Sequence, residues 1–169
     1  FTGNTTVNAG TLTLSGGSAI GNGATVTLAT AGSLKLASSE EIGVLTASGT
    51  GTVNLQANDL TIGGSTASSV GVVVSGTGKV VKNGSGVLTL SGANTFTGGV
   101  TVNTGNVSVG NAAALGMGAL VMNGGALSSS SATAYVLTNG YTLNGAVTLG
   151  DATKTGALTF GGSGAITAN

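Results

Sequence analysis

Residues 96–105 read Phe-Thr-Gly-Gly-Val-Thr-Val-Asn-Thr-Gly, and residues 1–10 read Phe-Thr-Gly-Asn-Thr-Thr-Val-Asn-Ala-Gly. The two stretches lie 95 positions apart and are identical at seven of ten positions. A weaker match relates residues 72–83 to residues 158–169, which lie 86 positions apart, so the second copy is nine residues shorter. Self-similarity on this scale is typical of repeat architectures, in which each unit packs only on its neighbours.

Short runs in which apolar and polar residues alternate recur along the whole chain. They occupy residues 11–14, 25–28, 33–36, 52–55, 59–62, 87–90, 146–149 and 157–160. A period of two is typical of strands with one buried face. Helical spacing is hard to find, and the best helix candidate is the short stretch 112–115, between Gly110 and Gly116.

The turns between these runs fit two architectures. Asn-Gly pairs at residues 83–84, 123–124, 139–140 and 144–145 suit the hairpins of an antiparallel sandwich or barrel. A parallel β-helix uses the same residues at its corners, where the backbone must bend sharply. The internal repeat favours the second architecture. We therefore predict an all-β parallel β-helix, a solenoid with three short strands per coil and roughly 20 to 28 residues per coil.

The repeat also predicts the domain organisation. We expect a single β-helix domain over residues 1–169, made of two sequence repeats (1–83 and 96–169) joined by residues 84–95. The chain starts where such a joining segment would end and stops where the next would begin. We therefore expect a segment of a longer tandem array.

Composition excludes several function classes. The chain is 40% hydrophobic and 5% charged, with 33 Gly, no Pro and no Cys, so it has enough apolar side chains to fold. A net charge of zero gives no basic surface for nucleic acid or anionic lipid. No run approaches the roughly 18 apolar residues of a membrane-spanning helix. We predict neither nucleic-acid binding nor direct membrane insertion of this segment.

Chemistry-bearing residues are scarce. The absence of His and Cys excludes catalytic triads and zinc sites built from them. The acids are Glu40, Glu41, Asp59 and Asp151, and only Glu40-Glu41 are adjacent, in what we predict to be a solvated loop. A polysaccharide-degrading β-helix needs clustered acids and bases, so it is the less favoured alternative. We predict no enzyme activity, no catalytic residue, no metal and no cofactor.

Three sets of residues recur in the repeat pattern. Asn8, Asn83, Asn103 and Asn169 hold equivalent positions, and we predict corner Asn residues whose side-chain amides form a ladder between coils. Phe1 and Phe96 also correspond and are predicted to fill the core. Outward Thr residues at 11, 13, 25, 27 and 101 motivate an alternative function, a carbohydrate- or ice-binding face. That alternative requires Thr pairs to align on one sheet through several coils.

Residues 84–109, which read GSGVLTLSGANTFTGGVTVNTGNVSV, resemble the autotransporter-associated β-strand repeat, also called the passenger-associated transport repeat. A partial second copy covers residues 1–14. Val100 stands where Thr is usual, and Asn106-Val107 where Thr-Leu is usual, both conservative changes in a strand. The residues that carry the resemblance are Gly84, Gly86, Leu88, Leu90, Gly92, Asn94, Phe96, Gly98, Val102 and Gly105.

The resemblance implies a secreted bacterial passenger segment built as a right-handed parallel β-helix. It implies an extracellular or cell-surface location and a role in adhesion, in biofilm formation or as a stalk or fibre, without catalytic residues. The expected partners are further repeats of the same polypeptide or end-to-end copies of this chain. A host or matrix glycan is the other partner that this role suggests.

Overall fold

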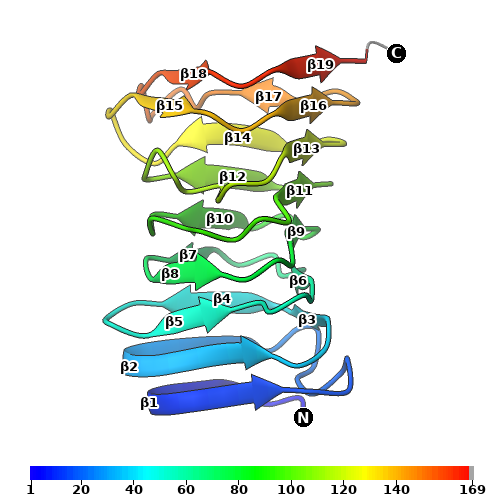
Figure 1. The fold of residues 1–169 in the computed structure, drawn as a ribbon, viewed down its shortest axis with the longest axis vertical. Coiled ribbons are helices and arrows are strands. Elements are labelled where there is room, and N and C mark those ends of the chain that lie inside the picture. The colour runs from blue at the N-terminus through cyan, green and yellow to red at the C-terminus, as the bar shows by residue number, and fades with distance from the viewer. Residues whose placement is uncertain (168–169) are drawn as a thin grey trace.

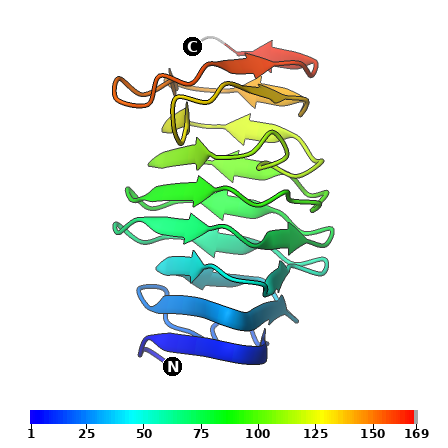
Figure 2. The ribbon, with the colours of Figure 1, turned by 90° about the vertical axis from the view of Figure 1, so that its left-hand side faces the viewer.

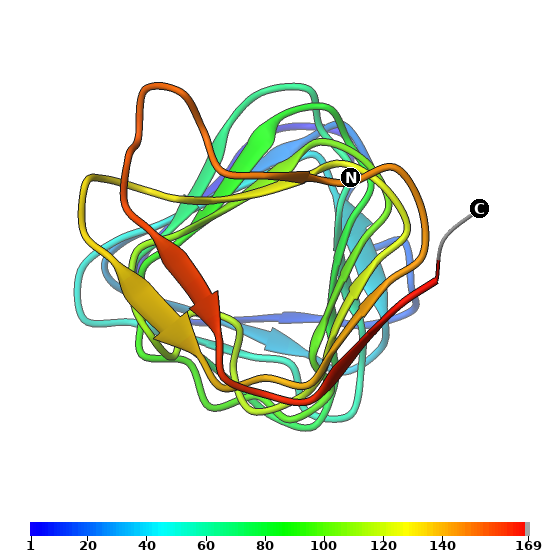
Figure 3. The same ribbon diagram turned by 90° about the horizontal axis from the view of Figure 1, so that it is seen from above.

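The chain winds into a stack of about eight coils, shown from the side in Figures 1 and 2. This computed structural model describes residues 1–167, and that part of the chain is all β with no helix. Seen from the C-terminal end, the chain turns counterclockwise as it rises toward the viewer (Figure 3), which makes the coil right-handed. The predicted fold class, an all-β parallel β-helix, is confirmed.

The strands of the stack lie on three faces. Two long strands, β1 (Thr5–Leu14) and β2 (Thr25–Leu36), each run along the first face and on into the second. The first face continues with β4 (Val44–Ala47), β7 (Ser68–Val70), β10 (Val87–Leu90), β12 (Asn106–Val109), β14 (Ala126–Ser129) and β17 (Thr148–Leu149). The second face holds β5 (Thr52–Asn54), β8 (Val73–Ser75), β15 (Tyr135–Leu137) and β18 (Leu158–Phe160). The third face holds β3 (Glu40–Ile42), β6 (Leu60–Ile62), β9 (Val80–Lys82), β11 (Val100–Val102), β13 (Leu120–Met122), β16 (Tyr141–Leu143) and β19 (Gly164–Ile166).

All pairings between these strands are parallel, and their register gives the length of a coil. On the third face the step from one coil to the next is even from β3 to β13, where successive partners are Glu40, Leu60, Val80, Val100 and Leu120. The next two steps, to Tyr141 and to Gly164, are longer. On the first face the step is uneven, since Val26 pairs with Leu45 whereas Thr46 pairs with Ser69. The coil is therefore at the short end of the predicted range, and insertions are absorbed at corners.

The core is the inside of this tube, filled by every second residue of each strand. On the first face Leu88, Val107 and Leu127 are register partners, and all are buried. Each such side chain contributes about 1.5 to 3 kcal/mol by leaving water. Stacking one aliphatic side chain on the next explains why the sequence alternates so regularly.

The second face is interrupted in the middle of the stack. Between β8 and β15, the coils that carry β10 and β12 form no strand there. In one of them the helix candidate 112–115 forms only a tight turn, in which the Asn111 side chain accepts from the Ala113 N–H at 2.8 Å. Ala114 and Leu115 are fully buried, so this turn fills the core in place of a strand.

The sequence repeat and the coil do not have the same period. The offset between the two sequence copies is not a whole number of coils, so equivalent segments fall on different faces. Residues 5–7 pair on the first face, whereas residues 100–102 pair on the third. What the repeat preserves is local: strand residues on both sides of a left-handed glycine (Gly10 at φ 78°, Gly105 at φ 77°), which lies within β1 in the first copy and between β11 and β12 in the second. Residues 84–95, predicted to join the repeats, contain β10, which is paired on both sides.

Within residues 1–167 no helix exists that could cross a membrane.

Candidate functional site

The ten motif residues that carry the resemblance lie in consecutive coils at mid-height of the stack, from the corner before β10 to the corner after β11. Leu88, Leu90, Phe96 and Val102 point inward and are at most 1% exposed. The apolar half of the motif therefore builds the core.

The motif glycines lie where successive coils come too close for a side chain. A Cβ at Gly84 would meet the carbonyl oxygen of Gly64 in the coil below, and a Cβ at Gly105 would meet that of Gly84. Gly105 also has a left-handed backbone, which L-residues rarely adopt. The same obstruction by a backbone carbonyl one coil below applies to Gly86, Gly92 and Gly98. The glycine half of the motif therefore sets the spacing of the coils.

Asn94 replaces a strand at the interruption of the second face. Its side chain is 2% exposed, and its Oδ1 accepts from the Val74 N–H in the coil below at 2.8 Å. Its Nδ2 donates to the Ala114 carbonyl in the coil above at 2.6 Å. One side chain thus satisfies backbone groups of the coils below and above it, at a place where its own coil forms no strand. This is the physical reason for an Asn at this place in the motif.

A ladder of Asn side chains runs up the corner that follows the third face. The Nδ2 of Asn103 donates to Oδ1 of Asn83 at 2.6 Å, and Asn123 donates to Asn103 at 2.7 Å. Asn144 donates to Asn123 at 2.8 Å, and the hydroxyl of Thr167 donates to Asn144 at 3.0 Å. The ladder therefore links five coils through their side chains, in addition to the backbone sheets.

The structure brings together two of the four corner Asn residues singled out in the sequence. Asn83 and Asn103 are in the ladder, whereas Asn8 is exposed on β1, where the register with β2 shifts. Asn169 lies outside the described residues. Asn123 and Asn144 were not singled out, although both precede a glycine as Asn83 does. Phe96 fills the core as predicted, whereas Phe1, in the first coil of the described stack, is 73% exposed.

Glu40 and Glu41 do not form a solvated loop, and that prediction is wrong. They begin β3, and strand alternation turns Glu40 into the tube, where it is 3% exposed. One carboxylate oxygen, Oε1, accepts from the Ile20 N–H at 2.8 Å. The other, Oε2, is buried with no hydrogen-bond partner among the described residues. Glu40, like Asn94, supplies an acceptor to a backbone group of the coil below.

Lys82 is a second charged residue inside the tube. It is 1% exposed at the end of β9, between its register partners Ile62 and Val102. Its Nζ donates to the Gly84 carbonyl at the corner. Desolvation by burial lowers the pKa of this ammonium group.

Hydroxyl side chains form a single column on the first face. Successive register partners are Thr6, Thr27, Thr46, Ser69, Thr89, Ser108 and Ser128. The Thr pairs seen in the sequence do not repeat beside this column: Thr25 is followed by Val44, and Thr13 of the second face by Lys35. On the second face Thr11 is followed by Ser33, but neither Thr pair is repeated as a pair in the next coil. Ser108 and Ser128, at the upper end of the first-face column, are buried.

Acidic residues are not gathered at any point of the described chain. Asp59 pairs with Lys79 at 3.3 Å on the surface, and Asp151 accepts from the Thr153 hydroxyl at 2.7 Å. Residues 1–167 contain no cluster of three or more Asp, Glu, His or Cys side chains of the kind that holds a metal ion.

The comparison with known families bears on the same coils. A family model described as the passenger-associated-transport repeat matches residues 1–14 and 80–109, and the second range spans β9 to β12 with the whole motif. No curated protein and no solved structure matches the chain. The repeat and the β-helix together fit a passenger segment of an autotransporter, and passengers with this repeat are secreted or lie at the cell surface. As the resemblance predicted, the family model that matches residues 1–14 and 80–109 is that of the passenger-associated-transport repeat.

Proposed function

We propose that this chain is a structural segment of a bacterial surface protein and serves as a stiff β-helical stalk or fibre without enzymatic activity. The observation that carries the proposal is the continuous bonding between coils. Third-face strands pair in unbroken order from β3 to β19, and the Asn ladder runs beside the upper part of that sheet. Such a stack transmits load along its axis and needs no ligand to do so.

The same coils support the partners proposed for this chain, further coils above and below. Phe96 is fully buried because coils pack on both sides of it, whereas Phe1 and Ile166 are 73% and 71% exposed at the ends of the stack. Exposed apolar side chains and open sheet edges favour association. We propose stacking on further repeats of the same polypeptide first, and end-to-end stacking of separate copies second. Light scattering and electron microscopy of the purified chain test the second form, which predicts concentration-dependent filaments.

Deleting two coils tests the stalk. Because Val80, Val100 and Leu120 are register partners, removing residues 80–119 joins Lys79 to Leu120 at equivalent positions. A stalk so shortened should still fold and reach the cell surface, about 10 Å shorter at about 4.8 Å per coil. Small-angle scattering of the purified chain measures the shortening, and surface labelling of cells measures export. Loss of adhesion with surface labelling intact would instead place adhesion in these coils and contradict a purely mechanical role.

The ice-binding alternative needs paired, exposed Thr columns on one flat face, and the first-face hydroxyl column does not support it, since its upper members Ser108 and Ser128 are buried. A polysaccharide-degrading role receives none from the scattered acids of the described residues.

A further inference from the structure

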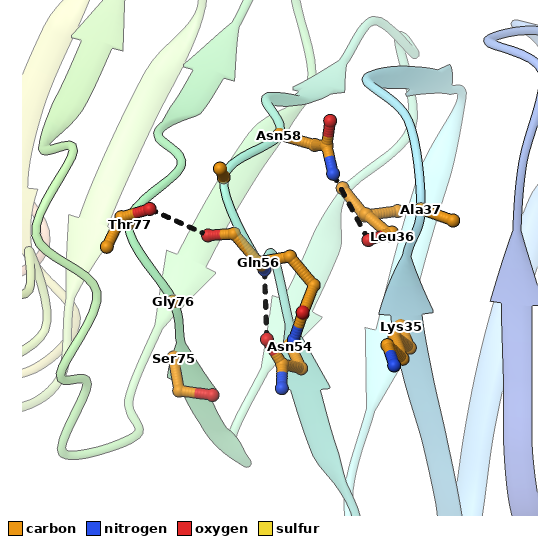
Figure 4. A pocket seen from close by; sticks show the side chains of 10 residues that line it. Lys35, Leu36, Ala37, Asn54, Gln56, Asn58, Ser75, Gly76 and Thr77 are labelled. Atoms are coloured by element: carbon orange, nitrogen blue, oxygen red, sulfur yellow. Dashed lines mark hydrogen bonds between the residues drawn. The ribbon is translucent and has the colours of Figure 1, made fainter.

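A hollow of about 710 Å³ opens on the second face in the lower part of the stack (Figure 4). It crosses three successive coils, those of β2, β5 and β8, and it includes the corner that follows each strand. Its polar side chains are Lys35, Asn54, Gln56, Asn58, Ser75 and Thr77. None of them belongs to the motif or to the Asn ladder.

Three of these side chains form an outward column. Lys35, Asn54 and Ser75 are successive register partners, so one polar group is presented per coil, about 4.8 Å from the next. Lys35 is exposed, and the other two are half-buried. An extended ligand that lies along the stack would meet them in turn.

Gln56 is held at the centre of the hollow by a strained backbone. Its φ of 54° is left-handed, a conformation uncommon outside glycine. The Gly78 N–H donates to its carbonyl at 2.9 Å, and its own N–H donates to Oδ1 of Asn54 at 2.9 Å. These bonds use the backbone and leave the Gln56 side-chain amide without a partner among residues 1–167, beside Asn54 in Figure 4.

The charge of the hollow is positive. Lys35 is the one charged side chain among the residues that line it. The nearest acid by sequence, Asp59, is already neutralised by Lys79 at 3.3 Å. No aromatic ring lines the hollow, so a ligand would bind through charge and hydrogen bonds and not by stacking.

We propose that this hollow binds an acidic saccharide chain, one that carries uronate or sulfate groups. The anionic group pairs with the Lys35 ammonium, and ring hydroxyls bond to the amides of Asn54 and Gln56 and to the Ser75 hydroxyl. Three neutral amide and hydroxyl groups around one cation match a hydroxyl-rich ligand better than a peptide, which needs apolar pockets for its side chains. The proposal adds an adhesive role to the stalk and does not depend on its mechanical one.

The test is a chemical-shift titration of the ¹⁵N-labelled chain with hexagalacturonate, at low and at high salt. We expect shifts confined to the residues of the hollow, weakened by salt because exposed charges are screened. Maltohexaose, which is neutral, should bind at least fivefold more weakly. Lys35→Gln should weaken hexagalacturonate binding about fivefold, the size expected of one exposed ion pair. Lys154→Gln removes the same charge outside the hollow and should change nothing.

The variant Gln56→Gly tests the contribution of the side chain alone, because it removes the amide and keeps the backbone conformation. Glycine accepts the left-handed φ, so the fold and melting temperature should be kept while hexagalacturonate binding falls. The proposal is overturned if hexagalacturonate shifts no residue of the hollow, if Lys35→Gln binds like the parent, or if a hexaglutamate peptide binds as well as the saccharide. None of these results would bear on the stalk, which the coil deletion tests.

Discussion

The Nδ2 of Asn103 donates to Oδ1 of Asn83, one coil below, at 2.6 Å. The bond has a direction, because each ladder Asn above Asn83 donates to the Asn one coil below it. An Asp in the ladder keeps the acceptor and loses the donor. Its effect therefore depends on whether the residue has a ladder partner below.

Asn103→Asp should lower the free energy of unfolding by about 1 to 2 kcal/mol, since it removes one bond and sets two oxygens against each other. Asn83→Asp is the matched control. Asn83 is the lowest member of the ladder, so its Asp still accepts from Asn103 and should cost less than about 0.5 kcal/mol. Urea unfolding at pH 7 compares the two variants. Equal losses would show that the ladder bonds contribute nothing directional.

Asn94 should be among the polar residues most costly to truncate. Asn94→Ala leaves the Val74 N–H and the Ala114 carbonyl without partners in a buried site, at about 1 to 3 kcal/mol for each unsatisfied group. The exposed Asn22 offers a control, and Asn22→Ala should be neutral within about 0.5 kcal/mol. Thermal melting measures both variants. A small effect at Asn94 would mean that water replaces the side chain at the interruption of the second face.

Glu40 should tolerate loss of its charge but not of its acceptor. Glu40→Gln keeps an oxygen that accepts from the Ile20 N–H and places a neutral amide group where Oε2 is buried. The free energy of unfolding should therefore be equal or higher. Glu40→Ala removes the acceptor and opens a cavity, which should cost about 2 to 4 kcal/mol. If both variants lose the same stability by urea unfolding, the carboxylate has a role that an amide cannot fill.

The core of the motif gives a direct test of which residues face inward. Leu88→Asp buries a charge among aliphatic side chains and should unfold the neighbouring coils, because each coil packs on the next. Thr89→Asp, one residue away on the outward side of β10, should lower the melting temperature by only a few degrees. Melting followed by circular dichroism distinguishes the two variants. Similar losses would contradict the inward and outward assignment.

The alternation within each strand is a local signal, and together with the internal repeat it was sufficient to predict the fold. Alternation identifies which residues of a strand are buried, and it did so for Leu88 and Val102. The same rule would have turned Glu40 and Lys82 inward, as residues two positions from Ile42 and Val80. A charged side chain is ordinarily expected in solvent. Both side chains are nevertheless buried, and each has a backbone hydrogen-bond partner.

Long-range features could not be predicted in the same way. Whether Asn8 joins the ladder depends on the face that its strand occupies, which is set by the lengths of all the coils between it and the ladder and not by its neighbours. The hollow beside Gln56 arises from three coils together, and its residues share no motif. Register within the stack is thus the quantity that a single sequence leaves open.

Lys82 should make the stability of the chain depend on pH. Burial lowers the pKa of Lys82 in the folded chain below 10.5, the value of a free lysine, so the unfolded chain holds this proton more tightly. Between the lowered pKa of the folded chain and 10.5 the unfolded state binds more protons, so the free energy of unfolding rises with pH in that window.

Lys82→Met removes this dependence and fits the same space between Ile62 and Val102. It should raise stability at pH 7 by about 1 kcal/mol, since no carboxylate pairs with the ammonium group in the described structure. Urea unfolding of both proteins at pH 7, 8, 9 and 10 isolates the contribution of Lys82, because the tyrosines and other lysines titrate alike in the two. Parallel curves at every pH would show that the ammonium group reaches water in the folded chain.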